Sequence, residues 1–346
     1  MIEPIVMNQE FERIKQIDDY SSLIWTTRYY ECGDFEIVLP VTEEYNQIIV
    51  RGNYLIRDDD EHVGIIEDIT IDSPEDDADR MIVTGRFAES ILARRIIGEQ
   101  TQLYGTVSAG ISALIYDNII NPDIPERRIE NFEVVPGGFP DRLDAQYTGK
   151  NLLDVIVDVC KTTHTGFGVQ LTEDNVFQFY LYKGADRSYG QTENPYVIFS
   201  DEYDNLQSSQ YTRNSSEVVT DVLVAGEGEG QERKTLWVSM AGKSGLERYE
   251  KYADKRNLST NNGEITEEEY NAQMQEEGFE NITQITSAFE GNVYFDNVEY
   301  KKDVYMGDVV TIENAAWNVS INSRLIEVIE SVNEAGVYET IPTFGV

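Results

Sequence analysis

The chain has 346 residues, of which 40% are hydrophobic and 26% charged, and its formal net charge is −37. This length suffices for two or three domains, and the composition is that of a globular protein. The charge argues against tight nucleic-acid binding, which depends on Lys and Arg displacing counterions. It fits a plain soluble surface, a surface that DNA passes without binding, or adaptation to high salt. No apolar run reaches the ~18 residues of a membrane span, and the first residues lack signal-peptide features, so we expect synthesis in the cytoplasm.

Residues 1–90 are predicted to form a small antiparallel β-barrel. Apolar residues alternate with polar ones in segments 35–39, 63–71 and 81–87, a pattern typical of half-buried strands. Helical spacing follows at 90–98. The first domain is therefore expected to be almost entirely β.

Residues 91–200 are predicted to form a small α/β domain. The segment 121–141 carries four prolines and a Gly-Gly pair, which makes it a boundary candidate. Beyond it, Asn151 can cap a helix, with Asp154 three residues further on. An alternating apolar segment at 176–183 then predicts a strand.

The rest of the chain is predicted to be a second β-barrel, residues 201–241 and 292–346, interrupted by an inserted helical domain, residues 242–291. The insert is polar, and Thr266 and Glu269 have capping-box spacing before a helical segment. The predicted fold class is β-rich α+β, with two related antiparallel β-barrels, a small α/β domain and a helical insert.

One internal similarity supports two related barrels. Gly64–Thr70 (GIIEDIT) and Arg324–Glu330 (RLIEVIE) share an aliphatic pair, a glutamate and an isoleucine two positions later. Each segment lies in a predicted strand that follows a polar turn. Alternating strands often resemble one another, but two copies of one unit would leave this similarity behind.

The sequence offers no pattern for catalysis or metal binding. His62 and His164 are the only histidines, and neither belongs to a zinc motif. Cys32 and Cys160 could be drawn as one disulfide, but reduced thiols are favoured in a cytosolic protein. Cys160 and His164 could form a nucleophile pair, although a buried thiol beside a helix-end histidine is favoured. We therefore predict no catalytic, cofactor-binding or metal-binding residues.

Two further sequence features resemble functional motifs but have ordinary explanations. Gly242–Ser244 ends like a phosphate-binding loop, but the motif requires a glycine where Trp237 stands, so a turn is expected. Carboxylate pairs are frequent, yet 64 acidic residues produce such pairs by chance. A glycosidase pair would need a defined separation in a cleft, which a sequence does not show.

An ordered set of segments carries a family resemblance. Trp25–Pro40 (WTTRYYECGDFEIVLP) resembles the opening of siphophage-type tail hub proteins. Later segments follow in the family's order, among them GIIEDI, TGRF, GKNLLDVI, YKGADRS, VAGEGEGQER, YMGDVVTI and IPTFG. The family shares its architecture with contractile-tail hubs and with the N-terminal part of tail-associated lysins.

The resemblance implies a structural hub at the tail tip of a virion. Three copies would form a ring of six barrels with pseudo-sixfold symmetry. The implied partners are a distal tail protein ring, the tape-measure protein and tip or receptor-binding proteins, and DNA would later pass through the bore. Lysin-type relatives continue into hydrolase or receptor-binding domains, whereas this chain stops at Val346, so no enzyme activity is expected.

Two alternatives stay open. A host-surface tip protein could bind carbohydrate through some of the 21 tyrosines, and a pull-down on host cell walls would identify it. A cell-wall hydrolase using carboxylates is the less favoured alternative, and a zymogram would test it.

Overall fold

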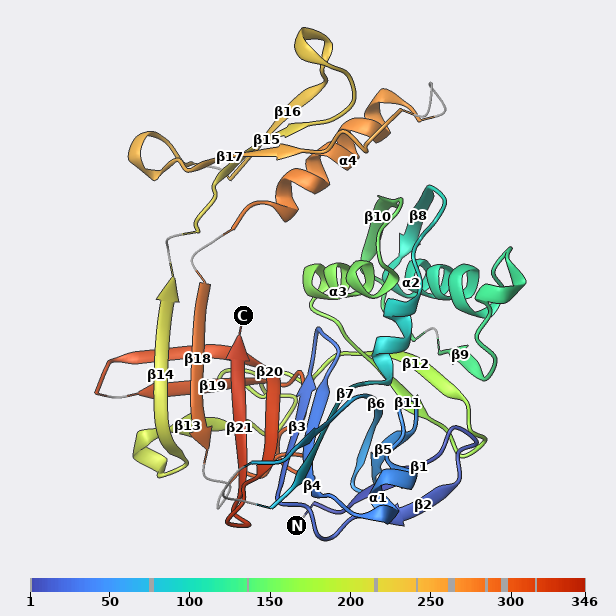
Figure 1. Ribbon diagram of the computed structural model, residues 1–346. Coiled ribbons are helices and arrows are strands. Elements are labelled where there is room, and N and C mark those ends of the chain that lie inside the picture. The colour runs from blue at the N-terminus through green and yellow to red at the C-terminus, as the bar shows by residue number, and fades with distance from the viewer. Residues whose placement is uncertain are drawn as a thin grey trace.

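In the computed structural model, 16 strands of the described residues form one large sheet, and Figure 1 shows their arrangement. The structure describes residues 2–74, 78–135, 137–214, 217–240, 242–260, 265–283, 286–293, 298–314 and 316–345. The path through this sheet runs β14-β18-β21-β20-β3-β4-β7-β6-β11-β12-β9. Its first strands in the chain are β1 (Pro4–Met7), β2 (Arg13–Gln16), β3 (Ser22–Arg28), β4 (Asp34–Pro40), β5 (Tyr54–Arg57), β6 (Asp60–Asp72) and β7 (Arg80–Phe87).

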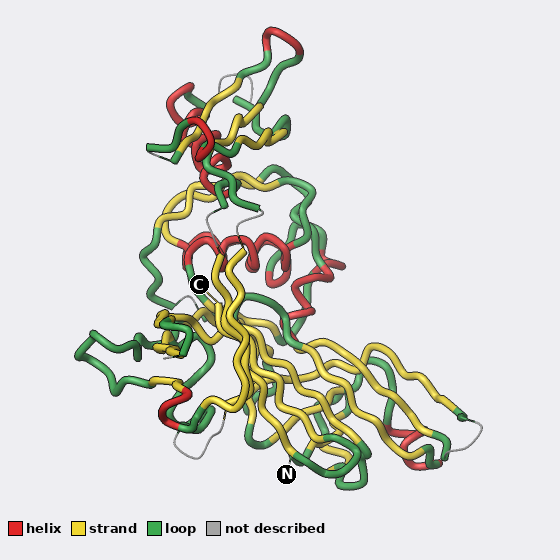
Figure 2. The backbone as a smooth tube through the Cα atoms, turned by 90° about the vertical axis from the view of Figure 1, so that its left-hand side faces the viewer, coloured by secondary structure: helices red, strands yellow, loops and turns green. Residues whose placement is uncertain are grey.

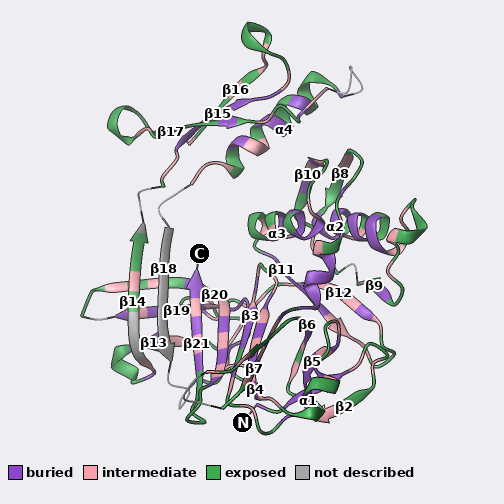
Figure 3. Cartoon of the chain, viewed as in Figure 1, coloured by how far each residue is buried: buried purple, intermediate pink, exposed green. Residues whose placement is uncertain are grey.

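The later strands of the large sheet come from the C-terminal half of the chain. They are β13 (Ile198–Ser200), β14 (Leu206–Asn214), β18 (Thr286–Val293), β19 (Val309–Asn314), β20 (Val319–Val332) and β21 (Tyr338–Gly345). Figure 3 shows buried residues along the central strands of this sheet. The short helix α1 (Glu43–Ile48) begins at Thr42, whose hydroxyl accepts a hydrogen bond from the Tyr45 N–H at 3.1 Å.

Two groups of five strands have the same topology. The group β3 to β7 is ordered β5-β6-β7-β4-β3, and the group β14 and β18 to β21 is ordered β19-β20-β21-β18-β14. We call them the first and second strand repeats. Gly64–Thr70 lies in β6 and Arg324–Glu330 in β20, which occupy the same place in the two repeats. Each of these strands also has a register shift beside its shared glutamate. The sequence similarity therefore marks a repeated unit.

The β-rich α+β fold predicted from the sequence is confirmed in its coarse form. Among the residues that the structure describes, the strands form a continuous mixed sheet in which no closed barrel is found. The two repeats are joined directly, because β20 pairs with β3 from Glu327 opposite Arg28 to Val332 opposite Leu23. The two closed barrels stay a prediction.

A small α/β unit follows the first repeat. Its strands are β8 (Thr101–Thr106), β9 (Phe132–Val134), β10 (Arg142–Tyr147), β11 (Gly166–Leu171) and β12 (Phe177–Tyr182), and its α-helices are α2 (Val107–Ile115) and α3 (Leu152–Thr163). A π-helical turn (Tyr116–Ile120) continues α2, and a 3-10 helix (Ala88–Arg94) precedes β8 where helical spacing was expected. The predicted cap is confirmed, since the Asn151 side chain accepts the Leu153 N–H at 3.0 Å. Gln170 opposite His62 joins β11, and through it β12 and β9, to β6 within the large sheet, whereas β8 and β10 form a separate two-stranded sheet.

The insert is a separate unit between β14 and β18. Its sheet has the order β16-β15-β17, from β15 (Asp221–Ala225), β16 (Thr235–Ser239) and β17 (Glu250–Asp254), and α4 (Glu267–Glu280) covers one face. The predicted capping box of Thr266 and Glu269 is present at the start of α4. Figure 2 shows the insert at the top of the molecule, above the helices of the small α/β unit and the long strands.

The position of β15 and β16 differs from the sequence-based boundary, which assigned them to the second barrel within residues 201–241. Both strands pair inside the insert instead, β15 with β16 and with β17. Alternating apolar residues predict a strand but do not say which strand it pairs with. Here Val222 and Val224 pack on Tyr270 and Met274 of α4, which fixes the strands in the insert.

The remaining short helices are 3-10 turns at Pro125–Arg127, Asp201–Tyr203, Gly230–Glu232 and Gly245–Glu247. The last lies just past Gly242–Ser244, which forms no phosphate-binding loop at the start of an α-helix. None of the helices in the described part of the chain is long and apolar enough to cross a membrane.

Candidate functional site

The two strand repeats are held together by buried ionic groups beneath the pairing of β20 with β3. At one end of this pairing, Arg28 Nε donates to Glu327 Oε2 at 2.7 Å, and Arg28 also pairs with Asp34. Further along β20, Glu330 lies opposite Trp25. Here β20 pairs with both β21 and β3, and the Glu330 side chain is buried.

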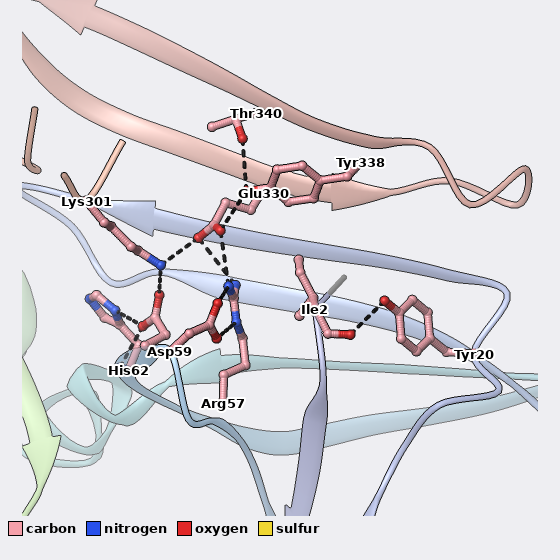
Figure 4. Close-up of polar contacts among 10 residues, drawn as sticks. Ile2, Tyr20, Arg57, Asp59, His62, Lys301, Glu330, Tyr338 and Thr340 are labelled. Carbon is pink, nitrogen blue, oxygen red and sulfur yellow. Dashed lines mark hydrogen bonds and ion pairs between the residues drawn. The ribbon is translucent and has the colours of Figure 1, made fainter. Parts of the chain in front are cut away.

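Arg57 and Glu330 form the centre of this arrangement (Figure 4). Arg57 ends β5 of the first repeat, and its side chain is 1% exposed, against 5% for that of Glu330. Arg57 Nη2 lies 3.1 Å from Glu330 Oε1, and Nη1 lies 3.3 Å from Oε2. The guanidinium also pairs with Asp59 at 2.8 Å and lies over the Trp25 ring, 5.4 Å from its centroid. It is thereby paired on more than one edge and stacked on a ring face.

A lysine extends the cluster toward the turn between β5 and β6. Lys301 Nζ lies 2.9 Å from Glu330 Oε2 and 2.6 Å from Asp60 Oδ2. Asp60 Oδ1 in turn lies 2.6 Å from His62 Nδ1. On the other side, the Tyr338 hydroxyl donates to Glu330 Oε1 at 3.0 Å. We call this set the ionic seam: Arg57, Asp59, Asp60, His62, Lys301, Glu330 and Tyr338.

The charges in the ionic seam stabilise one another. Burial alone would lower the pKa of His62, but the Asp60 carboxylate raises it to about 9. Burial would raise the pKa of Asp60, but His62 and Lys301 hold it well below its ordinary value. The pKa of Lys301 is raised, since Asp60 and Glu330 outweigh its burial. At neutral pH the charged groups of the seam therefore have opposite charges as neighbours, and the neutral Tyr338 hydroxyl donates to Glu330.

This arrangement suits a structural role, holding the two repeats in place, better than a catalytic one. A general acid or base needs a pKa near the working pH, whereas Asp60 stays ionised and His62 stays protonated at neutral pH. Breaking a buried pair by removing one partner is costly, because the other charge stays buried without compensation. Removing any one charged residue of the seam is therefore expected to weaken the contact between the two repeats.

A cavity of about 630 Å³ opens beside the seam. It is lined by the turn residues 58–62, by Tyr180 and Tyr182 of β12, and by residues 300–301 and 305–306 before β19. Tyr180 donates to Glu61 at 2.7 Å. In the described ranges, no group of three His, Cys, Asp or Glu residues is placed to hold a metal ion.

Cys160 and His164 both lie at the C-terminal end of α3, whereas His62 and Cys32 lie elsewhere. His62 is in the ionic seam, whereas His164 is the left-handed C-cap of α3, with its ring 3.4 Å from the Tyr30 hydroxyl. Cys160 is a buried free thiol on α3. Cys32 is also a free thiol, with its sulfur 3.6 Å from the Phe87 carbonyl oxygen. Sequence reasoning missed Arg57, Lys301 and Glu330, because charged residues of this kind recur throughout an acidic chain.

Two strand edges lack the kind of pairing that joins β20 to β3. In the second repeat, β19 covers β20 up to about Leu325 and β3 then pairs with it from Glu327. In the first repeat, hydrogen bonds from Gly52 and to Asn53 cover β6 up to Ile66. Beyond that point, residues 67–72 pair only with β7 among the described strands, and β14 likewise pairs only with β18. In the repeats, β6 corresponds to β20 and β14 corresponds to β3, and β20 and β3 pair with each other within the chain.

Three of the similar solved structures are tail proteins. A tail protein from Neisseria meningitidis MC58 superposes with a TM-score of 0.59 at 12% identity, covering 99% of this chain and 96% of that one. The 43 kDa tail protein of prophage MuSo2 from Shewanella oneidensis gives 0.58 at 13% identity, covering 99% and 98%. Prophage tail protein gp18 from Listeria monocytogenes EGD-e gives 0.54 at 11% identity, covering 99% and 94%. These likenesses show a shared fold.

The comparison with protein families covers nearly the whole chain. The family model described as Siphovirus ReqiPepy6 Gp37-like protein matches residues 3–346. The search of curated proteins found no match.

Proposed function

Because the chain belongs to the Siphovirus ReqiPepy6 Gp37-like protein family, we propose that this phage tail protein is the hub of the tail tip, built as a closed ring of three copies. The observation that carries the proposal is the pair of open strand edges. Each edge has a counterpart that is already paired within the chain, so a neighbouring copy can repeat that pairing.

The register of the pairing between copies follows from the repeats. Through the strand pairings, Trp25 of β3 corresponds to Gln210 of β14 and Arg28 to Arg213. Glu327 and Glu330 of β20 correspond to Glu67 and Thr70 of β6 by the sequence similarity. Since Glu327 lies opposite Arg28 and Glu330 opposite Trp25, β14 of one copy is expected to pair antiparallel with β6 of the next. Arg213 would then lie opposite Glu67, and Gln210 opposite Thr70.

The side chains at these edges support the assignment. Thr27-Arg28 and Thr212-Arg213 are the same dipeptide at corresponding positions, and Arg213 is exposed. On the partner edge, Ile69 is 37% and Ile71 54% exposed. An exposed, unpaired edge with apolar side chains invites further pairing, and closing a ring removes it.

Three copies with two repeats each would place six repeats around one axis. Such a ring can dock on a sixfold distal tail protein ring, with the tip or receptor-binding proteins on its other side. The bore would admit the tape-measure protein and then DNA, and the net charge of −37 favours passage without binding. In this proposal the chain is a structural component at the tail tip of the virion and has no enzymatic role.

Cross-linking of the purified chain tests the ring and its register together. Cysteines at Thr70 and Gln210 (T70C/Q210C) should form disulfides between copies, giving a band at three times the monomer mass under non-reducing conditions. The control T70C/T212C is displaced by two residues and should cross-link poorly. A ladder beyond three would indicate an open filament, and an uncross-linked monomer at every concentration would contradict the proposed ring.

A further inference from the structure

The insert carries an exposed aromatic row on the face of its sheet that α4 does not cover. Trp237 of β16 lies opposite Leu223 of β15, and Leu223 lies opposite Tyr252 of β17. Trp237 is 47% and Tyr252 55% exposed, and Leu223 between them is half-buried. The neighbouring residues Val222, Val224 and Val238 point the other way, into the core beneath α4. We call this row the aromatic platform.

The rest of the chain leaves the aromatic platform accessible. Gln273 and Glu276 of α4 line a cleft shared with Ala145 and Tyr147 of β10, so α4 lies on the side of the insert that faces the small α/β unit. Figure 1 shows the insert sheet on the far side of α4 from that unit. The platform therefore faces away from the body of the molecule.

Each ring of the platform is contacted by an arginine, Trp237 by Arg248 and Tyr252 by Arg233. The Arg248 guanidinium lies over Trp237, 5.1 Å from the ring centroid, and pairs with the buried carboxylate of Asp221. Arg233 donates to the Tyr252 hydroxyl and to the Ala225 carbonyl oxygen, each at 2.8 Å. With both guanidiniums anchored to the sheet, the rings keep their positions before any ligand arrives.

We propose that the aromatic platform binds a β-1,4-linked polysaccharide. Sugar rings present a flat face of C–H groups that stacks on the electron-rich face of Trp or Tyr. Trp237 and Tyr252 stand on the two outer strands. These strands are two interstrand spacings, or about 10 Å, apart. In a β-1,4 chain, every second sugar presents the same face, at close to this separation. The half-buried Leu223 leaves room for the intervening sugar.

The polar groups around the row suit the same ligand. Glu250 and Ser239 border it on one side, and Asp254 and Thr235 border it on the other, by their register with Asp221 and Ala225. Carboxylates accept and hydroxyls exchange hydrogen bonds with the equatorial hydroxyls of a glycan. The platform therefore combines stacking surfaces with hydrogen-bonding groups at its borders.

A protein partner fits these features less well. A stable protein interface buries about 800 Å² on each side and involves 20–30 residues, whereas this row offers three side chains between charged borders. A glycan needs only the rings and their polar borders.

Binding to defined hexasaccharides tests the proposal on the full chain, independently of ring formation. Titration with the β-1,4-linked hexamer of N-acetylglucosamine, followed by calorimetry, should show saturable binding. Trp237→Ala and Tyr252→Ala should each weaken it at least tenfold. Trp317→Ala is the matched control, since Trp317 is 49% exposed on the loop between β19 and β20, and it should change the affinity less than twofold.

The same titrations test whether the platform prefers β-linked over α-linked sugars and whether it binds a glycan or a second copy of the chain. Maltohexaose, whose α-linked chain curves, should bind at least tenfold more weakly than the β-linked hexamer. Equal binding of both sugars, no binding of the β-linked hexamer, or unchanged affinity in Trp237→Ala would each overturn the proposal. Concentration-dependent self-association that Trp237→Ala abolishes would instead assign the platform to a second copy. Circular dichroism of each variant confirms that the insert stays folded.

Discussion

Arg57 and Glu330 are 273 residues apart in the sequence, yet they form a buried ion pair at 3.1 Å. One residue ends a strand of the first repeat and the other lies within a strand of the second. Lys301 contacts the same carboxylate at 2.9 Å, so Glu330 balances two positive charges. The pair links the two repeats through their side chains, in addition to the backbone pairing of β20 with β3.

Glu330→Gln is expected to destabilise the protein strongly. The substitution keeps the shape of the side chain but removes the charge that the buried Arg57 shares with the partly exposed Lys301. Removing one partner of a buried pair costs about 3–5 kcal/mol. Arg80→Gln, which breaks the solvent-exposed pair with Asp72 at 2.8 Å, is the control and should cost at most about 1 kcal/mol. Urea denaturation measures both, and equal losses would show that the ionic seam does not hold the repeats together.

His62 should make the stability depend on pH in the neutral to alkaline range. Its pKa is raised to about 9 in the folded protein by Asp60, with Glu89 and Glu61 adding to the effect, against an ordinary value near 6.5. A raised pKa contributes stability that is fully present below pH 6.5 and is lost as pH rises through 9. The full contribution is about 3 kcal/mol as an order of magnitude.

The measurement is the free energy of unfolding at pH 6, 7.5 and 9 for the unmodified chain and for His62→Gln. The unmodified chain should lose stability over this range, and the variant should lose less. Asp60→Asn should flatten the profile in the same way, because it removes the carboxylate that holds the proton on His62. His164→Gln is the control, since the pKa of His164 is lowered by burial and by the nearby Arg324 and Lys183. A slope that His62→Gln leaves unchanged would assign the pH dependence to other groups.

The sequence predicted individual helices and strands better than it predicted which strands pair with each other. Alternation identified the strands and Asn151 identified the start of α3, since both signals lie within a few residues. The repeated segment at Gly64–Thr70 and Arg324–Glu330 even indicated the two strand repeats. By contrast, the partner of a strand depends on contacts far along the chain, so β15 and β16 were assigned to the wrong sheet. The Arg57–Glu330 pair could not be chosen from 27 basic and 64 acidic residues.

Gly184 is expected to tolerate no side chain. It follows β12, and a Cβ atom added there would lie 1.9 Å from the carbonyl carbon of Gly307, in the segment before β19. Since both sides of this contact are backbone, Gly184→Ala must move one segment, at a cost of at least about 1–3 kcal/mol. Gly98→Ala is the control, because no atom lies within 4 Å of its added Cβ. Thermal unfolding should separate the two variants, and equal melting temperatures would mean that the segment before β19 moves freely.

The insert should be removable without unfolding the large sheet. Asn214 at the end of β14 lies directly opposite Thr286 at the start of β18, so the chain leaves and re-enters the sheet at adjacent positions. The insert also has its own core beneath α4, built from residues such as Val222, Val224, Tyr270 and Met274. Replacing residues 217–283 with a short Gly-Ser turn would therefore convert β14 and β18 into a hairpin, which costs little in loop entropy.

The shortened chain is expected to stay soluble, to unfold cooperatively and to retain the T70C/Q210C cross-link, because β14 and its open edge are preserved. It should also lose all binding of the β-linked hexasaccharide, since the aromatic platform lies wholly in the insert. Circular dichroism melts measure the cooperative unfolding, and the non-reducing gel measures the cross-link. Aggregation of the shortened chain would show that the cleft between α4 and β10 stabilises the body, and retained sugar binding would place the glycan site outside the insert.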